Sequence, residues 1–147
     1  MIKKTFVFAF IGILVLSCKP NVTAGDMAKL NGYWEIEKVV FPDGTTKEYG
    51  INEVYDYFEI KSNKGIRKKV MPQLDGTFLV NDAFEKIAIK ENHEKYYINY
   101  STSFSKWQEE LISISNQEMV LVNDSKIEYH YKRAATINLT GNGEKTK

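Results

Sequence analysis

Apolar and polar side chains alternate with a period of two through most of the chain between about Leu30 and Ala135. In the first such segment Trp34 and Ile36 alternate with glutamates, and Val40 continues the apolar set. Four further segments show the same period, with apolar positions at Phe58 and Ile60, Ile87 and Ile89, Ile112 and Ile114, and Ile127, Tyr129 and Tyr131. This alternation is typical of β-strands that bury one face.

Polar turn signals separate these segments and complete the prediction of the fold. They are Asp43-Gly44, Asn63-Lys64-Gly65, Asp75-Gly76, Glu91-Asn92-His93 and Asn123-Asp124-Ser125. No segment has the pattern of a long amphipathic helix. We therefore expect an all-β, antiparallel fold of about eight strands. A small up-and-down β-barrel is favoured over an open sheet because closure removes the exposed strand edges.

The chain begins with the pattern of an export signal. Lys3 and Lys4 precede an unbroken apolar run from Phe6 to Leu16, and Cys18 closes the segment. Such a run is too short to span a bilayer. We expect a signal peptide over residues 1–17.

The end of the apolar run resembles a bacterial lipobox, in which a small residue, here Ser17, precedes the cysteine. The resemblance implies that Cys18 receives diacylglycerol, becomes the mature N-terminus and is acylated on its amine, typically with palmitate. Two or three acyl chains anchor a protein stably to a membrane. The alternative is an inert thiol within a discarded signal peptide.

The rest of the chain divides into three parts. Residues 18–29 are rich in small and polar side chains, so we expect a lipidated N-terminus followed by a flexible tether. Residues 30–135 are the expected barrel, and residues 136–147 an expected disordered tail. Lys19-Pro20-Asn21 contains no acidic residue. By analogy with lipoproteins generally, this favours the outer membrane, and we expect the periplasmic face.

Charge and cysteine content exclude several classes of protein. The chain has 20 basic and 19 acidic residues, and two of the lysines lie in the expected signal peptide. The mature chain is therefore close to neutral, which argues against a nucleic-acid partner. Cys18 is the only cysteine, so the chain can form neither an internal disulfide nor a cysteine-based metal site.

Three residues resemble the motif of lipocalins and lipocalin-like domains. Gly32 and Trp34 match the Gly-x-Trp signature that opens the first strand, and Arg133 stands on the last strand. The resemblance implies that Gly32 permits a tight chain crossing, that Trp34 plugs the closed end, and that Arg133 covers the indole in a cation–π contact. The whole layout is similar to short lipocalin-like lipoproteins of Gram-negative envelopes.

Aromatic side chains gather in the second half of the chain and suggest a ligand pocket. The candidate lining residues are Phe58, Ile60, Tyr100, Trp107, Tyr129 and Tyr131. Such a pocket would take an apolar molecule, with tyrosine hydroxyls as its few polar contacts. The alternative for each side chain is plain core packing.

No constellation of residues points to catalysis or to a metal or other cofactor. His93 falls in an expected turn, and His130 is expected to face outward from its strand. Glu109 and Glu110 are adjacent, so on a strand they face opposite ways and cannot act as an acid/base pair. We therefore expect no enzyme, no metal site and no cofactor.

Five cations gather around one expected hairpin, at Lys61, Lys64, Arg67, Lys68 and Lys69. They could contact acidic lipid headgroups, or they could form a solvated hairpin with protected edges.

Taken together, these features favour a lipid-anchored envelope protein whose barrel binds a small apolar ligand or lipid. The alternative is an interaction module, in which a barrel filled with side chains presents its outer surface to another envelope protein.

Overall fold

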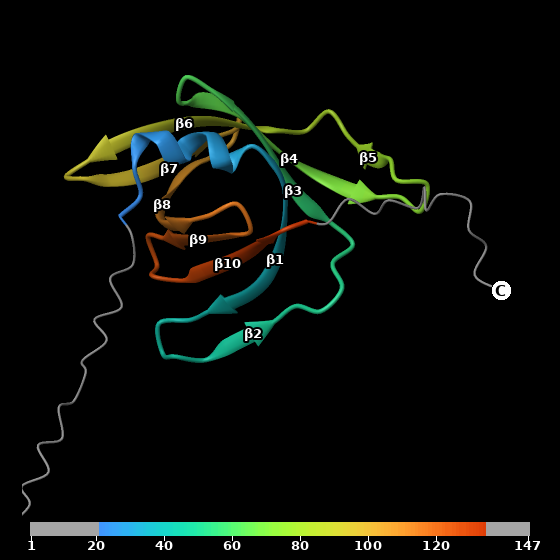
Figure 1. The fold of residues 1–147 in the computed structure, drawn as a ribbon, viewed down its shortest axis with the longest axis horizontal. Coiled ribbons are helices and arrows are strands. Elements are labelled where there is room, and N and C mark those ends of the chain that lie inside the picture. Colours follow the sequence, from blue (N-terminus) through green and yellow to red (C-terminus); the bar gives the residue numbers. More distant parts are fainter. Residues whose placement is uncertain (1–20, 135–147) are drawn as a thin grey trace, which may run out of the picture.

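A computed structural model describes residues 21–134, which form one antiparallel sheet that closes on itself (Figure 1). A 3₁₀-helix, η1 (Ala24–Leu30), precedes the strands. The strands are β1 (Gly32–Val40), β2 (Thr46–Glu48), β3 (Tyr55–Lys61), β4 (Lys64–Pro72), β5 (Phe78–Val80), β6 (Glu85–Asn92), β7 (Lys95–Ser101), β8 (Lys106–Ile114), β9 (Glu118–Asn123) and β10 (Glu128–Arg133).

Eight of the ten strands make the barrel. The order is β1, β3, β4, β6, β7, β8, β9, β10, and β10 pairs with β1 to close the ring. The short strands β2 and β5 pair only with β1 and β4 and lie outside the ring. The prediction of an all-β, up-and-down barrel of about eight strands is therefore confirmed.

The two ends of the barrel differ in their connections. At one end, called the closed end, the β3–β4 and β6–β7 hairpins turn through two residues each. Both residues of each turn, Ser62–Asn63 and His93–Glu94, have positive φ, as tight hairpin turns require. The opposite, open end carries the longer β1–β2, β2–β3, β5–β6 and β7–β8 loops.

Two β-bulges interrupt the alternation that the sequence suggests. The register of β1 against β10 shifts between Ile36 and Lys38, so Val39 rather than Val40 is buried. The register of β8 against β9 shifts between Leu111 and Ser113. Leu111 therefore shares the inner face with Ile114, and the predicted pairing of Ile112 with Ile114 on one face is wrong.

Helix η1 packs against the closed end of the barrel (Figure 1). Its Met27 and Leu30 are buried in the main core, and Val22 packs against the same core from before the helix. The sequence analysis placed Val22 and Met27 in a flexible tether over residues 18–29 and began the barrel at Leu30. That prediction is wrong for residues 24–29, because they belong to η1 and Met27 anchors them by its burial in the core.

Other predictions concern residues outside the described range. The expected signal peptide (1–17), Cys18 and the expected tail (136–147) are among them. Within residues 21–134, no helix is both long enough and apolar enough to traverse a bilayer.

Candidate functional site

The closed end of the barrel is sealed by Trp34 and Arg133. Trp34 is fully buried, and its indole Nε1 donates a hydrogen bond to the Leu30 carbonyl at 2.8 Å. The Arg133 guanidinium carbon lies 3.8 Å from the centroid of the Trp34 ring. This is a cation–π contact, in the arrangement that the resemblance to lipocalins implies.

Arg133, at the end of β10, also contacts two other parts of the chain, residues 29–31 and the β8–β9 turn. Its Nη1 and Nη2 donate to the carbonyls of Asn31 and Lys29 at 2.6 and 2.7 Å, and its Nε donates to the carbonyl of Asn116 at 3.0 Å. Gly32 has a φ of +112°, and a Cβ added there would lie 3.0 Å from Arg133 Nη1. Both backbone freedom and space therefore favour glycine at this position.

Beyond the apolar core, the inner face of the barrel carries a cluster of buried charges. Arg67 on β4 is 7% exposed, and its Nε donates to Glu85 Oε2 at 2.9 Å. Its Nη1 lies 3.9 Å from Oε2 of the buried Glu109. The guanidinium carbon stands 4.3 Å from the centroid of the Tyr100 ring. The sequence prediction placed Arg67 in a cationic hairpin, and its burial went unrecognised.

A second ion pair on the same inner face joins a buried carboxylate to a half-exposed lysine. The Lys69 Nζ is 2.5 Å from Oδ1 of Asp56, whose side chain is almost completely buried. Asp56 shares its face with Phe58, because both alternate inward along β3. Burial, and then the nearby carboxylates of Asp56 and Glu109, raise the pKa of Tyr131 well above its usual value.

Burial disfavours the ionised form of Glu109 more than the nearby positive charges favour it. Burial raises the pKa of Glu109, while the neighbouring Arg67 opposes the shift. Burial also raises the pKa of Tyr100 well above its usual value, and the charge of Glu109 adds to this effect. Within residues 21–134, neither the Tyr100 hydroxyl nor Glu109 Oε2 makes a hydrogen bond of normal geometry.

A cavity of about 650 Å³ opens at the open end, beside the β2–β3 loop. We call it the mouth cavity. Its walls combine two tyrosines and three aliphatic side chains with polar groups that include the Asp56–Lys69 pair; the residues are Ile36, Ile51, Asn52, Glu53, Val54, Asp56, Lys69, Tyr129 and Tyr131. A cavity of this size and mixed lining suits a small organic ligand.

Comparison with known protein families decides the identity of the fold. The family model described as a lipocalin-like domain matches residues 30–121. This chain belongs to the family of lipocalin-like domains. The match includes Gly32 and Trp34 and ends in β9, before Arg133.

Two solved structures are similar to this lipocalin-like domain. A lipocalin-like protein from Bacteroides uniformis is 12% identical with a TM-score of 0.46, and the match covers 72% of this chain and 99% of that chain. An uncharacterized protein from Bacteroides eggerthii is 11% identical with a TM-score of 0.45, covering 71% of this chain and 99% of that chain. Among curated proteins, none matches the chain.

The six residues predicted to line one pocket all belong to the main core of this lipocalin-like domain or pack against it. Phe58 is fully buried and Ile60 packs against the same core. Tyr100 and Trp107 stack on each other with ring centroids 5.2 Å apart, next to Arg67. Only Tyr129 and Tyr131 line the mouth cavity. That these six side chains contact a ligand stays a prediction.

The five cations of the predicted hairpin cluster are also divided. Arg67 and Lys69 pair with inner-face carboxylates, whereas Lys61 and Lys64 are exposed beside the β3–β4 turn at the closed end. Lys68 Nζ lies over the Phe84 ring, 5.9 Å from its centroid. The alternation of side chains along β4 separates residues that are neighbours in the sequence.

The histidines do not come together. His93 lies in the β6–β7 turn, and the His130 ring is hydrogen-bonded to Glu128 at 2.9 Å. In the part of the chain that the structure describes, no three histidine, aspartate or glutamate side chains gather as metal ligands would. Glu109 is buried on the inner face, while Glu110 forms an ion pair with Lys95 at 2.8 Å.

Proposed function

We propose that this lipocalin-like domain binds a small, largely apolar molecule, such as a lipid, in its mouth cavity. The main support for this proposal is the cavity of about 650 Å³, which is lined by Tyr129 and Tyr131 together with the Asp56–Lys69 pair. The aromatic and aliphatic walls suit an apolar body. The ion pair offers one charged contact for a polar end of the ligand.

The distribution of exposed apolar side chains supports entry of such a ligand from the open end. All nine large apolar side chains that are exposed among residues 21–134 lie there, on loops, on β5 or near strand ends: Phe41, Ile51, Val54, Met71, Leu74, Leu79, Val80, Phe84 and Phe104. We call this set the apolar rim. Ile51 and Phe104 are 99% and 98% exposed. Their hydration costs free energy that contact with an apolar ligand or partner would recover.

We further propose that the protein is anchored through a lipidated Cys18 in the bacterial envelope, with the outer membrane and its periplasmic face favoured. The lipobox resemblance supports this. Asn21 lies at the closed end, where it borders a hollow with Tyr96 and Glu110. It lies three positions after Cys18, a separation that can span at most about 10 Å. Such an anchor would hold the closed end next to the membrane and direct the mouth away from it.

Native mass spectrometry of the full chain purified from membranes tests both parts of the proposal. We expect an intact mass that includes acyl groups on Cys18, and a second, non-covalent mass that disappears on denaturation. Ile36→Trp, which fills the mouth cavity, should lose the non-covalent mass. Ile66→Trp, which places the same ring on the outer face of β4, should retain it.

A second function is favoured by the apolar rim. Large exposed apolar patches commonly mark protein–protein interfaces. In this case the barrel is an interaction module, and the rim contacts another envelope protein. A preparation that carries no small molecule but copurifies with one protein through the rim would support this function over ligand binding.

A further inference from the structure

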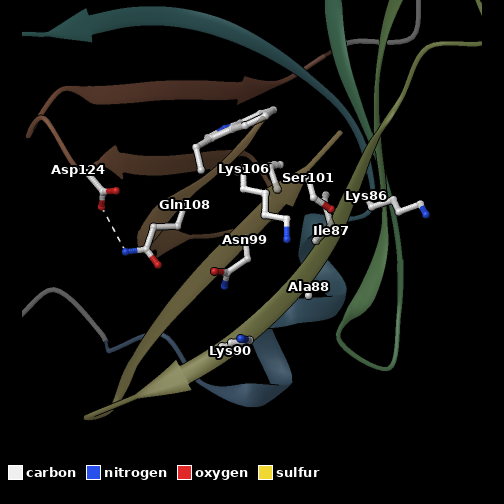
Figure 2. A pocket seen from close by; sticks show the side chains of 11 residues that line it. Lys86, Ile87, Ala88, Lys90, Asn99, Ser101, Lys106, Gln108 and Asp124 are labelled. Atoms are coloured by element: carbon white, nitrogen blue, oxygen red, sulfur yellow. Dashed lines mark hydrogen bonds between the residues drawn. The ribbon is translucent and has the colours of Figure 1, made fainter. Parts of the chain in front are cut away.

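The outer face of strands β6, β7 and β8 carries a hollow of about 450 Å³ that is separate from the mouth cavity (Figure 2). Small side chains create it. Ala88 pairs with Asn99, which pairs with Gln108, and in the next row Ser101 lies between Lys86 and Lys106. Ala88 and Ser101 are too short to fill the space that the longer neighbours enclose.

A second hollow of about 290 Å³ continues the first along the same face. The two share Lys90, Asn99 and Gln108, and the second adds Asn92 and Tyr97. We call the joined surface the lysine trough; it is formed by Lys90, Tyr97, Asn99, Ser101, Lys106 and Gln108. Figure 2 shows Asn99 between Lys106 and Lys90, whereas Lys86 extends away from them.

The lysines of the trough lack acidic partners in the described part of the chain. No ion pair joins Lys90 or Lys106 to a carboxylate among residues 21–134, although Lys69 and Lys95 on neighbouring strands are both paired. The one acidic side chain that borders the hollow is Asp124, and its Oδ1 accepts a hydrogen bond from Gln108 Nε2 at 3.2 Å. The trough is therefore a locally positive surface on a nearly neutral protein.

The side-chain amides add neutral hydrogen-bonding capacity. Asn99 Nδ2 donates to the Tyr97 carbonyl at 3.4 Å, which leaves its Oδ1 available as an acceptor. Gln108 uses its Nε2 on Asp124 and keeps Oε1 as an acceptor. The Ser101 hydroxyl can donate and accept. The trough thus offers cations, amides, a hydroxyl and a tyrosine. The first hollow is also lined by Ile87, Ala88, Tyr100 and Trp107, none of which belongs to the apolar rim.

We propose that the lysine trough binds an acidic oligosaccharide. Carboxylates or phosphates on the sugar would pair with Lys90 and Lys106. Sugar hydroxyls would bond to Asn99, Ser101 and Gln108, and the C–H face of a sugar ring would lie on Tyr97. An apolar ligand would leave the lysines and amides unpaired, at a cost in free energy. This site is independent of the mouth cavity and does not rest on the ligand proposed there.

Titration of the ¹⁵N-labelled protein with an oligogalacturonate, followed by NMR, tests the proposal. We expect chemical shift changes confined to the amides of β6, β7 and β8, and binding that weakens at high salt. Lys106→Gln should weaken binding about tenfold, the usual effect of losing one charge-assisted hydrogen bond. Lys61→Gln, which removes an exposed lysine at the closed end, is the matched control and should bind normally.

Three controls make the result decisive. A neutral maltooligosaccharide should bind at least tenfold more weakly, because it leaves the lysines unpaired. Inorganic phosphate should also bind more weakly, because it cannot use Tyr97 or the amides together. Ala88→Phe should block the hollow while favouring the strand, and its folded state is verified by the unchanged amide spectrum of the core. Equal binding of the neutral sugar or of phosphate, or shifts outside β6–β8, would overturn the proposal.

Discussion

At the scale of single residues, Arg133 is the most connected side chain of the closed end. It contacts the Trp34 ring at 3.8 Å and donates to carbonyls on η1, on Asn31 and in the β8–β9 turn. This one side chain of β10 therefore connects the last strand to η1 and to the first strand, β1. Its removal would leave three carbonyls and the indole face without a partner.

We expect Arg133→Gln to lower the free energy of unfolding by about 2 to 4 kcal/mol, from the lost cation–π contact and charge-assisted hydrogen bonds. Arg133→Lys keeps the charge over Trp34 but cannot bond all three carbonyls, so its loss should be intermediate. Urea denaturation followed by Trp fluorescence measures both. Equal stability of the glutamine variant and the native protein would contradict this role.

Glu109 predicts a dependence of stability on pH. Burial raises its pKa in the folded state. A carboxyl group of this kind contributes stability below its unfolded pKa, about 4.3, and that contribution is lost as the pH rises through the folded value. Glu109→Gln is neutral at every pH. It should therefore match the native protein near pH 4 and exceed its unfolding free energy at pH 7, measured by urea denaturation across this range.

Glu110→Gln is the control for this experiment. Glu110 faces outward and pairs with the half-exposed Lys95, so its replacement should change stability by less than about 1 kcal/mol. If Glu109→Gln were less stable than the native protein at pH 7, attraction to Arg67 would outweigh burial and the account of this cluster would be wrong.

The sequence identified some of these residues and missed others for a physical reason. Gly32, Trp34 and Arg133 could be found because a short motif and strand parity point to them. Asp56 is two residues from Phe58, so alternation along a strand puts both on the same face of the sheet. Arg67 pairs directly with Phe58 across the hairpin and therefore shares that face. Charged side chains are normally exposed, so burial of Arg67 becomes evident only once Glu85 and Glu109 are seen around it.

At the scale of elements, the alternation of apolar and polar residues predicted the positions of most strands. It gave the wrong buried residues where a β-bulge interrupts the pairing of two strands. A β-bulge inserts one residue and reverses parity beyond it, which moved the buried position from Val40 to Val39. Helix η1 is too short to show a helical period. Its two buried side chains, Met27 and Leu30, carry the only local signal, and both lie in a segment of otherwise small and polar residues.

Leu30→Ala tests whether η1 is part of the fold. Leu30 is fully buried in the main core. Truncation of such a side chain should lower the free energy of unfolding by about 3 kcal/mol, measured by urea denaturation. Ala28→Ser, on the exposed side of the same helix, should have little effect. No loss with Leu30→Ala would mean that the segment behaves as the free tether that its composition suggests.

At the scale of the whole molecule, the barrel has two chemically different ends. The closed end carries η1, the Trp34–Arg133 contact and the exposed Lys61 and Lys64. The open end carries the mouth cavity and the apolar rim. With the proposed anchor at Cys18, the closed end would lie next to the bilayer and its lysines would face anionic headgroups.

Fluorophores attached to single introduced cysteines can measure this orientation. Cys18 is the only native cysteine and would be blocked by lipidation. In proteoliposomes, a label at Asn63→Cys in the β3–β4 turn should be quenched strongly by headgroup-labelled lipids. A label at Asp75→Cys in the β4–β5 loop should be quenched weakly, since β1 alone extends about 30 Å. The reverse pattern would contradict the orientation without affecting the lipidation.

The central claim is that the mouth cavity holds a small molecule, and photocrosslinking in intact cells tests it most directly. A photoreactive amino acid replaces Val54, which lines the cavity, or Ile66, on the outer face of β4. After irradiation, the intact mass of each protein is measured. The account predicts an adduct of small-molecule mass at position 54 and none at position 66. No adduct at position 54, or one of the mass of a protein, would contradict it.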